Sequence, residues 1–97
     1  MRDYEITVVL KGNLEEEARN ELIERLLGWI GNAKEGAAEP MVEHWGLRQL
    51  AYPISKETEG YYVFVQAQME PTQVAELERN MQFVDDILRH LVVRHED

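Results

Sequence analysis

The chain has 97 residues, 44% of them hydrophobic and 30% charged, and its formal net charge is −9. This length predicts one domain over residues 1–97, built around a single core. Because the sequence has no cysteine, a disulfide framework and a thiolate metal site are excluded. Neither a signal peptide nor an apolar run long enough to span a membrane is visible, so we expect a soluble cytoplasmic protein.

The first third of the chain predicts a strand followed by a helix. Residues 4–10 alternate apolar and polar side chains, which is typical of a half-buried strand. Residues 13–31 predict a helix with Asn13 as N-cap, and the glutamates at 15–17 lie where the helix dipole favours anions. Residues 32–40 are predicted to form a loop. The predicted buried faces consist of Tyr4, Ile6, Val8 and Leu10 in the strand, and Ala18, Leu22, Ile23, Leu26, Leu27, Trp29 and Ile30 in the helix.

Two more strands are predicted in the middle of the chain. Residues 41–54 form an extended segment whose alternation breaks near Gly46, which indicates a bulge or a bend. Pro53 cannot donate to a ladder, so this segment is expected at a sheet edge. A polar turn over 55–59 leads to a third strand at 60–70. Leu47, Leu50 and Ile54 are expected to pack, as is the face formed by Tyr61, Val63, Val65, Ala67 and Met69.

The last third predicts a second helix and a fourth strand. The helix is expected to start at Pro71, with Thr72 as its cap, and to end before Asp85 and Asp86. Residues 88–94 form the last strand. The resulting order, βαββαβ, predicts an α+β, ferredoxin-like fold, in which two helices pack on one face of a four-stranded antiparallel sheet. The apolar positions of the second helix are Val74, Leu77, Met81 and Val84.

Acidic residues are concentrated on the predicted helices. Nine of the nineteen acids lie on or beside them, whereas Arg2, Arg48, Arg89 and Arg94 lie on or beside the predicted strands. Acidic helices are commonly explained by solubility alone, but that does not explain the arginines on the strands. The sheet side is therefore expected to be balanced or mildly basic, and this distribution decides what each face attracts.

No catalytic or metal-binding motif is present. The serines and threonines lie in no nucleophile elbow, the three histidines lack metal-ligand spacing, and the glycines form no phosphate loop. The segment EGYYVFVQA invites comparison with the third-strand signature of the RNA-recognition motif, which shares this fold class. Glu59, Tyr62 and Val63 replace its base, its small residue and its aromatic, so that signature fails. Outward-facing Tyr62 and Phe64 are left either to contact a partner or to pack within the sheet.

The chain resembles the bacterial small-subunit ribosomal protein six family over nearly its full length, from MRDYEITVVL to LRHLVVR. The most specific segment is GLRQLAYPISKETEGYY at residues 46–62, which is similar to the family pattern G-x-R-x-L-A-Y-P-I-x-K-x-x-x-G-x-Y at every stated position. The resemblance implies a structural, non-enzymatic ribosomal protein that needs no cofactor, metal or small-molecule substrate. It also implies binding to central-domain 16S rRNA together with ribosomal protein eighteen during assembly of the subunit platform.

The resemblance also implies site residues. Many relatives carry a second arginine where Gln49 stands, and several carry extra arginines around Gln82, Val84 and Leu88. We therefore expect few phosphate contacts and a strong dependence on the protein partner. The edge strand is the expected docking site for that partner. The RNA-facing residues implied by the resemblance are Arg2, Arg48, Lys56, Arg89 and Arg94. The partner-facing residues expected from the edge position are Glu43, Trp45, Leu47, Gln49, Tyr52 and Pro53.

Two other functions fit this fold class. A regulatory or oligomerisation module would bind a small molecule, but it has no reason to contain the LAYPI segment followed by a lysine. A small hydrolase of the acylphosphatase kind needs a phosphate-binding loop after the first strand. The sequence KGNLEEE places three acids there, which would repel phosphate.

Overall fold

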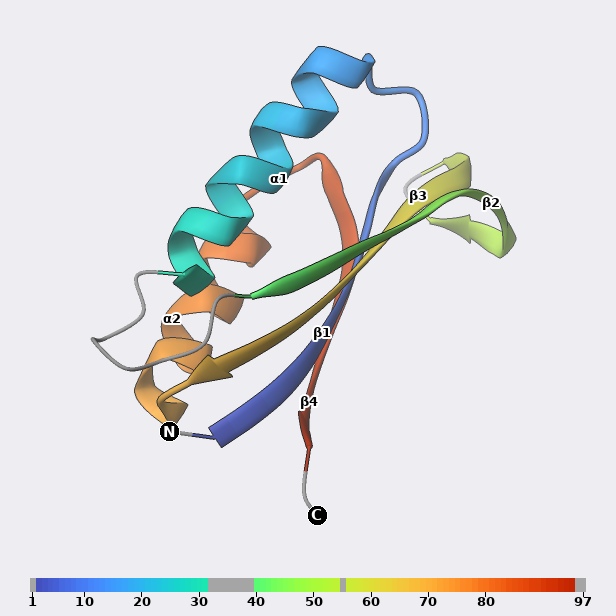
Figure 1. Cartoon of the computed structure of the whole chain (residues 1–97). Helices are drawn as coiled ribbons and strands as arrows, with labels where there is room; N and C mark the ends of the chain where they lie inside the picture. The colour runs from blue at the N-terminus through green and yellow to red at the C-terminus, as the bar shows by residue number, and fades with distance from the viewer. Residues whose placement is uncertain (1, 32–39, 55, 96–97) are drawn as a thin grey trace.

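The computed structural model describes residues 2–31, 40–54 and 56–95, and most of the predicted loop over 32–40 lies outside them. Four strands and two helices follow one another in the predicted order βαββαβ. Figure 1 shows them along the chain. The elements are β1 (Arg2–Lys11), α1 (Glu16–Gly31), β2 (Met41–Ile54), β3 (Glu57–Met69), α2 (Pro71–Gln82) and β4 (Ile87–His95).

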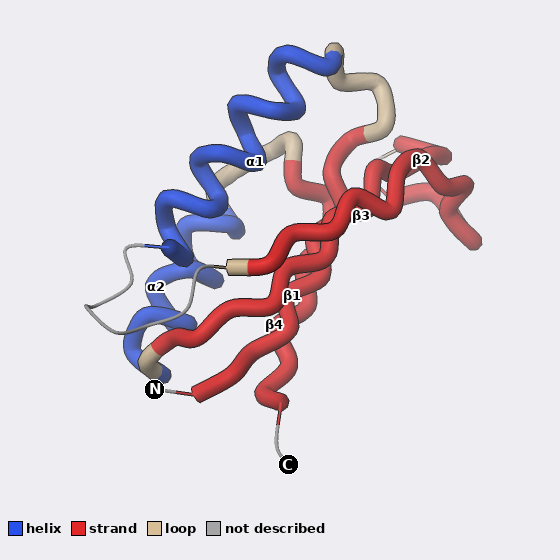
Figure 2. The backbone as a smooth tube through the Cα atoms, in the orientation of Figure 1, coloured by secondary structure: helices blue, strands red, loops and turns tan. Residues whose placement is uncertain are grey.

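The strands form one antiparallel sheet in the order β2-β3-β1-β4, so β2 and β4 are its edges. Both helices lie on the same face of the sheet, and the other face is left open (Figure 2). The ferredoxin-like arrangement predicted from the sequence is therefore confirmed, including the edge position of the strand that carries Pro53.

The core lies between this sheet and the two helices. The alternation of β1 buries Tyr4, Ile6, Val8 and Leu10 as predicted, and each faces a β3 residue across the ladder. The apolar side chains predicted to face the core from the two helices are buried or half-buried, except that of Ala18, which is exposed. The other members of the core are Leu22, Ile23, Leu26, Ile30, Val63, Val65, Ala67, Met69, Leu77, Met81 and Ile87.

Neither helix is capped by the residue that the sequence predicted. Asn13 lies in a turn, and α1 starts only at Glu16, where the Arg19 backbone N–H donates to the Glu15 carbonyl at 2.9 Å. In α2 the N-cap is Glu70, whose backbone N–H donates to Gln73 Oε1 at 2.7 Å. Thr72 is wrong as a cap because proline already occupies the first helical position and places the cap before it.

Strand β2 departs from regular pairing at two places. A register shift lies between His44 and Gly46, where Gly46 has a φ of +86°, a conformation that glycine adopts without steric cost. Residues 50–53 then leave the ladder, and pairing resumes at Ile54 with Glu57. β3 therefore starts at Glu57 rather than at residue 60. The bulge was predicted, whereas packing of Leu47 was not confirmed, because this side chain is 53% exposed.

Candidate nucleic-acid interface

All eleven residues predicted to contact RNA or a protein partner are exposed. They do not form one cluster. Side chains alternate between the faces of a strand, so Arg48, opposite Gly60, and Arg89, opposite Val9, lie on the open face of the sheet. Arg2 and Arg94 align with the buried residues Met69 and Tyr4, so they lie on the other side of the sheet.

A stack of two aromatic rings lies on the open face beside Arg48. The rings of Trp45 and Phe64 are 9° from parallel, and their centroids are 5.1 Å apart. Trp45 Nε1 donates to Glu43 Oε2 at 3.1 Å, and the Arg48 guanidinium carbon lies 5.8 Å from the Trp45 ring centroid. The bulge before Gly46 gives Trp45 this position, and the ring is still 42% exposed. The stack therefore forms an aromatic, partly polar surface that spans the edge strand β2 and its neighbour β3.

The segment LAYPI folds over the open face and reaches the opposite edge of the sheet. Val9 is only 4% exposed although it faces the open side, and it lines a cavity of about 90 Å³ together with Leu50, Tyr52 and Arg89. The Nη1 group of Arg89 donates to the Tyr52 hydroxyl over 3.4 Å. One residue predicted to contact the partner and one predicted to contact RNA are thus in direct contact.

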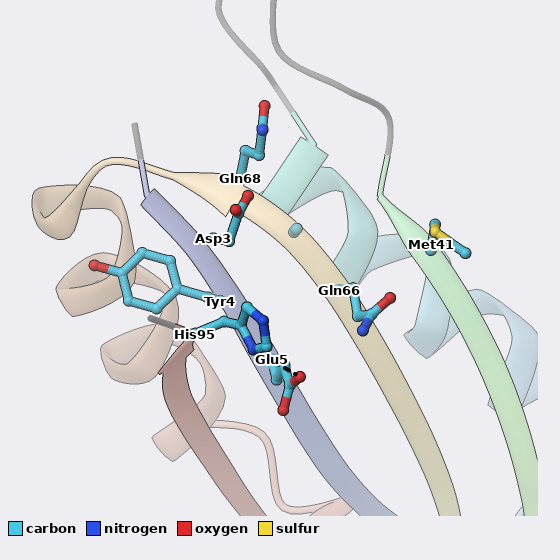
Figure 3. A pocket seen from close by; sticks show the side chains of 8 residues that line it. Asp3, Tyr4, Glu5, Met41, Gln66, Gln68 and His95 are labelled. Atoms are coloured by element: carbon cyan, nitrogen blue, oxygen red, sulfur yellow. Dashed lines mark ion pairs between the residues drawn. The ribbon is translucent and has the colours of Figure 1, made fainter. Parts of the chain in front are cut away.

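A larger cavity, of about 270 Å³, lies at the other end of the open face. Figure 3 shows Asp3 and Glu5 of β1, Gln66 and Gln68 of β3, and Met41 of β2 around it. The His95 ring lies over β1, and its Nδ1 is 3.3 Å from Glu5 Oε1. Carboxylates at this end make it unfavourable for phosphate and favourable for a cationic group.

The helical side carries exposed acids, and two of its arginines lie on aromatic rings. Glu16, Glu17, Glu21 and Glu24 are exposed along α1. The Arg19 guanidinium carbon is 4.1 Å from the Tyr61 ring centroid, and that of Arg25 is 5.4 Å from the Trp29 ring centroid. The helical side is therefore predominantly acidic, whereas the open face carries the exposed bases Arg48 and Arg89.

The described part of the chain contains neither a cluster of metal-binding residues nor a membrane-spanning helix. Residues 2–31, 40–54 and 56–95 contain no group of three or more histidine, cysteine or carboxylate residues arranged to hold a metal ion. Within the same ranges, no helix is long and apolar enough to cross a membrane.

Two features of this surface, the larger cavity and the contact between Tyr52 and Arg89, were not predicted from the sequence. The larger cavity combines residues from three strands and the C-terminal end of β4, so it follows from the register and has no local signal. The contact between Tyr52 and Arg89 joins residues 37 positions apart, from opposite edges of the sheet. The apolar run LAYPI could have indicated the second feature, because such a run is expected to pack against another apolar surface.

Comparison with known proteins shows which family has this arrangement. A family model described as "Ribosomal protein S6" matches residues 3–94. The chain is 41% identical over 96 residues to small ribosomal subunit protein bS6 of Alkaliphilus oremlandii, with 99% of both chains covered. It is 42% identical over 97 residues to small ribosomal subunit protein bS6 of Caldanaerobacter subterraneus subsp. tengcongensis, with 100% of both covered.

A solved structure agrees with these sequence relatives. The crystal structure of 30S ribosomal protein S6 from Thermotoga maritima matches with a TM-score of 0.83 and 30% sequence identity, covering 97% of this chain and 87% of that one. The resemblance first seen in residues 46–62 is thus confirmed in both sequence and fold. This chain belongs to the ribosomal protein S6 family.

Proposed function

We propose that this protein is a structural component of the small ribosomal subunit that binds central-domain 16S rRNA together with ribosomal protein eighteen. The observation that carries the proposal is the match to the ribosomal protein S6 family over residues 3–94. Exposure of Arg48, Tyr52 and Lys56, which belong to the most specific segment of the family pattern, supports it. The same match favours this function over a regulatory module or a small hydrolase.

The distribution of charge supports few contacts to RNA. Arg48 and Arg89 on the open face and Lys56, which lies between β2 and β3, are exposed cations that can reach phosphate oxygens. The acidic outer side of α1 would repel the same backbone. With so few cations, binding to RNA alone is expected to be weak, and its dependence on salt shallow.

Features of the edge strand support a basic protein partner. β2 is long, lies at the sheet edge and contains no buried residue, so its outer backbone groups are open to lateral docking. The carboxylates of Asp3 and Glu5, which line the larger cavity together with Met41 of β2, and that of Glu43 on β2 itself complement a positively charged partner. Such a partner would supply both the apolar contact and the positive charge that this chain lacks.

A titration tests whether RNA binding by this protein depends on ribosomal protein eighteen. The protein is titrated onto a central-domain fragment of 16S rRNA, with and without ribosomal protein eighteen, and the dissociation constant is measured at several salt concentrations. We expect the partner to strengthen binding at least tenfold, which corresponds to about 1.4 kcal/mol. Tight binding of this chain alone, with no gain from the partner, would contradict the proposal.

Replacement of Arg48 tests the RNA contact itself. Arg48→Ala is expected to weaken RNA binding in the presence of the partner by roughly tenfold, because a hydrogen bond to a charged group contributes about 1.5 kcal/mol. The slope of log K against log salt should become shallower by about one unit. The matched control is Arg79→Ala, because Arg79 is exposed on α2, on the acidic side. Equal losses in both variants would show a nonspecific effect of net charge.

A further inference from the structure

Residues 50–54 at the end of β2, called the hairpin tip below, lie over Val9 on the open face of the sheet. Residues 50–53 make no ladder pairs with β3, and Leu50, Tyr52 and Ile54 line the small cavity over Val9. Gly60 permits this close approach, because a Cβ there would lie 2.4 Å from Val9 Cγ1 and 3.3 Å from Leu50 Cδ2. The tip therefore packs on the central strands and ends beside β4.

This packing places the Tyr52 hydroxyl at Arg89. The two residues belong to the edge strands β2 and β4, which two other strands separate in the sheet. Among the described residues, the Tyr52 hydroxyl is the one side-chain hydrogen-bond partner found for Arg89. A guanidinium has five N–H donors in a fixed plane, so most donors of Arg89 remain available while its position is constrained.

Arg89 also borders a second cavity, which no residue of the tip lines. This cavity has a volume of about 180 Å³ and is lined by Thr7, Val9, Tyr62, His90 and Leu91 in addition to Arg89. Both cavities share Val9, Tyr62 and Arg89, so the bond between Tyr52 and Arg89 lies at the boundary between them. The guanidinium is thus held at the rim of a recess that is open to solvent on the predicted RNA side.

We propose that Tyr52 is a positioning residue of the RNA interface, which holds the Arg89 guanidinium at the rim of this recess so that its remaining N–H donors meet one phosphate group. The inference rests on the proposed function. A free arginine loses rotamer freedom when it binds, and a bond formed in advance reduces that loss. Tyr52 is suited to this role because it is 61% exposed and comes from the other edge strand, β2, so its hydroxyl reaches Arg89 across the open face.

A double-mutant cycle in the full chain tests the proposal. The dissociation constant for the central-domain 16S rRNA fragment is measured with ribosomal protein eighteen present, for Tyr52→Phe, for Arg89→Ala and for the double variant. We expect Tyr52→Phe to weaken binding three- to tenfold and Arg89→Ala to weaken it more. The double variant should bind no worse than Arg89→Ala alone, because the hydroxyl acts only through the guanidinium.

A second tyrosine provides the matched control. The Tyr61 hydroxyl is 2.8 Å from His44 Nδ1, on the helical side of the sheet, so Tyr61→Phe also removes a hydroxyl that has one side-chain partner. This variant should bind RNA as the unmodified protein does. The urea midpoint of each variant and its affinity for ribosomal protein eighteen without RNA are measured in parallel.

Each other outcome overturns the proposal in a different way. If Tyr52→Phe lowers the urea midpoint but leaves RNA affinity unchanged, the contact only holds the tip in place. Additive losses in the double variant would mean that Tyr52 contacts RNA by itself. A weaker complex with ribosomal protein eighteen alone would assign Tyr52 to the partner surface. If the unmodified protein binds no RNA with the partner present, the proposed function fails and this inference fails with it.

Discussion

Replacing Leu26 with alanine is expected to lower the free energy of unfolding by about 2–5 kcal/mol. Leu26 is 1% exposed and lies in the core where α1 packs against the sheet. Truncation removes its buried apolar surface and leaves a cavity that the surrounding core side chains close only in part. Because a domain of this size has a total stability of about 5–15 kcal/mol, the loss is a large share of it. Urea unfolding measured by circular dichroism gives the change directly.

Leu47 provides the control of the same residue type. Its side chain is 53% exposed on β2, so Leu47→Ala should change the free energy of unfolding by less than about 1 kcal/mol. A loss at Leu47 as large as that at Leu26 would mean that β2 is buried in the protein as it exists in solution, for instance by self-association through its edge.

Replacing Gly60 with alanine is expected to cost about 1–3 kcal/mol. The added methyl group would lie 2.4 Å from Val9 Cγ1, closer than real carbon atoms approach, and Gly60 itself is buried. Because Val9 has a branched and stiff side chain, it cannot rotate away from the added methyl group. The clash is therefore relieved only if the β3 backbone or the hairpin tip moves. The same urea measurement detects the loss, and the hairpin tip should become easier to cleave by a protease.

A double variant and a second glycine separate this clash from a general effect of alanine. In the Val9→Ala background the added methyl group has room, so Gly60→Ala should cost less there than in the unmodified chain. Gly28 lies in α1, and a Cβ there would meet no atom within 4 Å. Gly28→Ala should therefore stabilise the helix by about 0.5–1 kcal/mol. An equal cost of Gly60→Ala in both Val9 backgrounds would contradict this explanation.

Local patterns in the sequence were sufficient to predict the fold. The period-two alternation of residues 4–10 and 61–69 predicts the side chains that face the helices, although Val9 is buried as well, on the open face. Gly46 marks the bulge. The helix caps were less predictable, because several polar residues near each start can satisfy the same backbone groups. At α2 the cap is a glutamate, a residue that the usual preference for asparagine, serine or threonine does not select.

The candidate interface was predictable only in its composition. The family pattern selected Arg48, Tyr52 and Lys56, and all three are exposed. Their spatial relation to Arg89 depends on where residues 50–53 leave the ladder and on how the tip crosses the sheet, and no short-range pattern encodes these properties. The same limit applies to the cavity beside Asp3 and Glu5, whose walls come from different strands.

The central position of β1 has a consequence for the synthesis of this protein. β1 pairs with β3 on one side and with β4 on the other, although β4 is the last element of the chain. A nascent chain can therefore complete only one of the two ladders of its first strand until residues 87–95 have been made. Because such non-local pairing raises the contact order, folding should be slow for a domain of this size, and it should finish only after translation of β4.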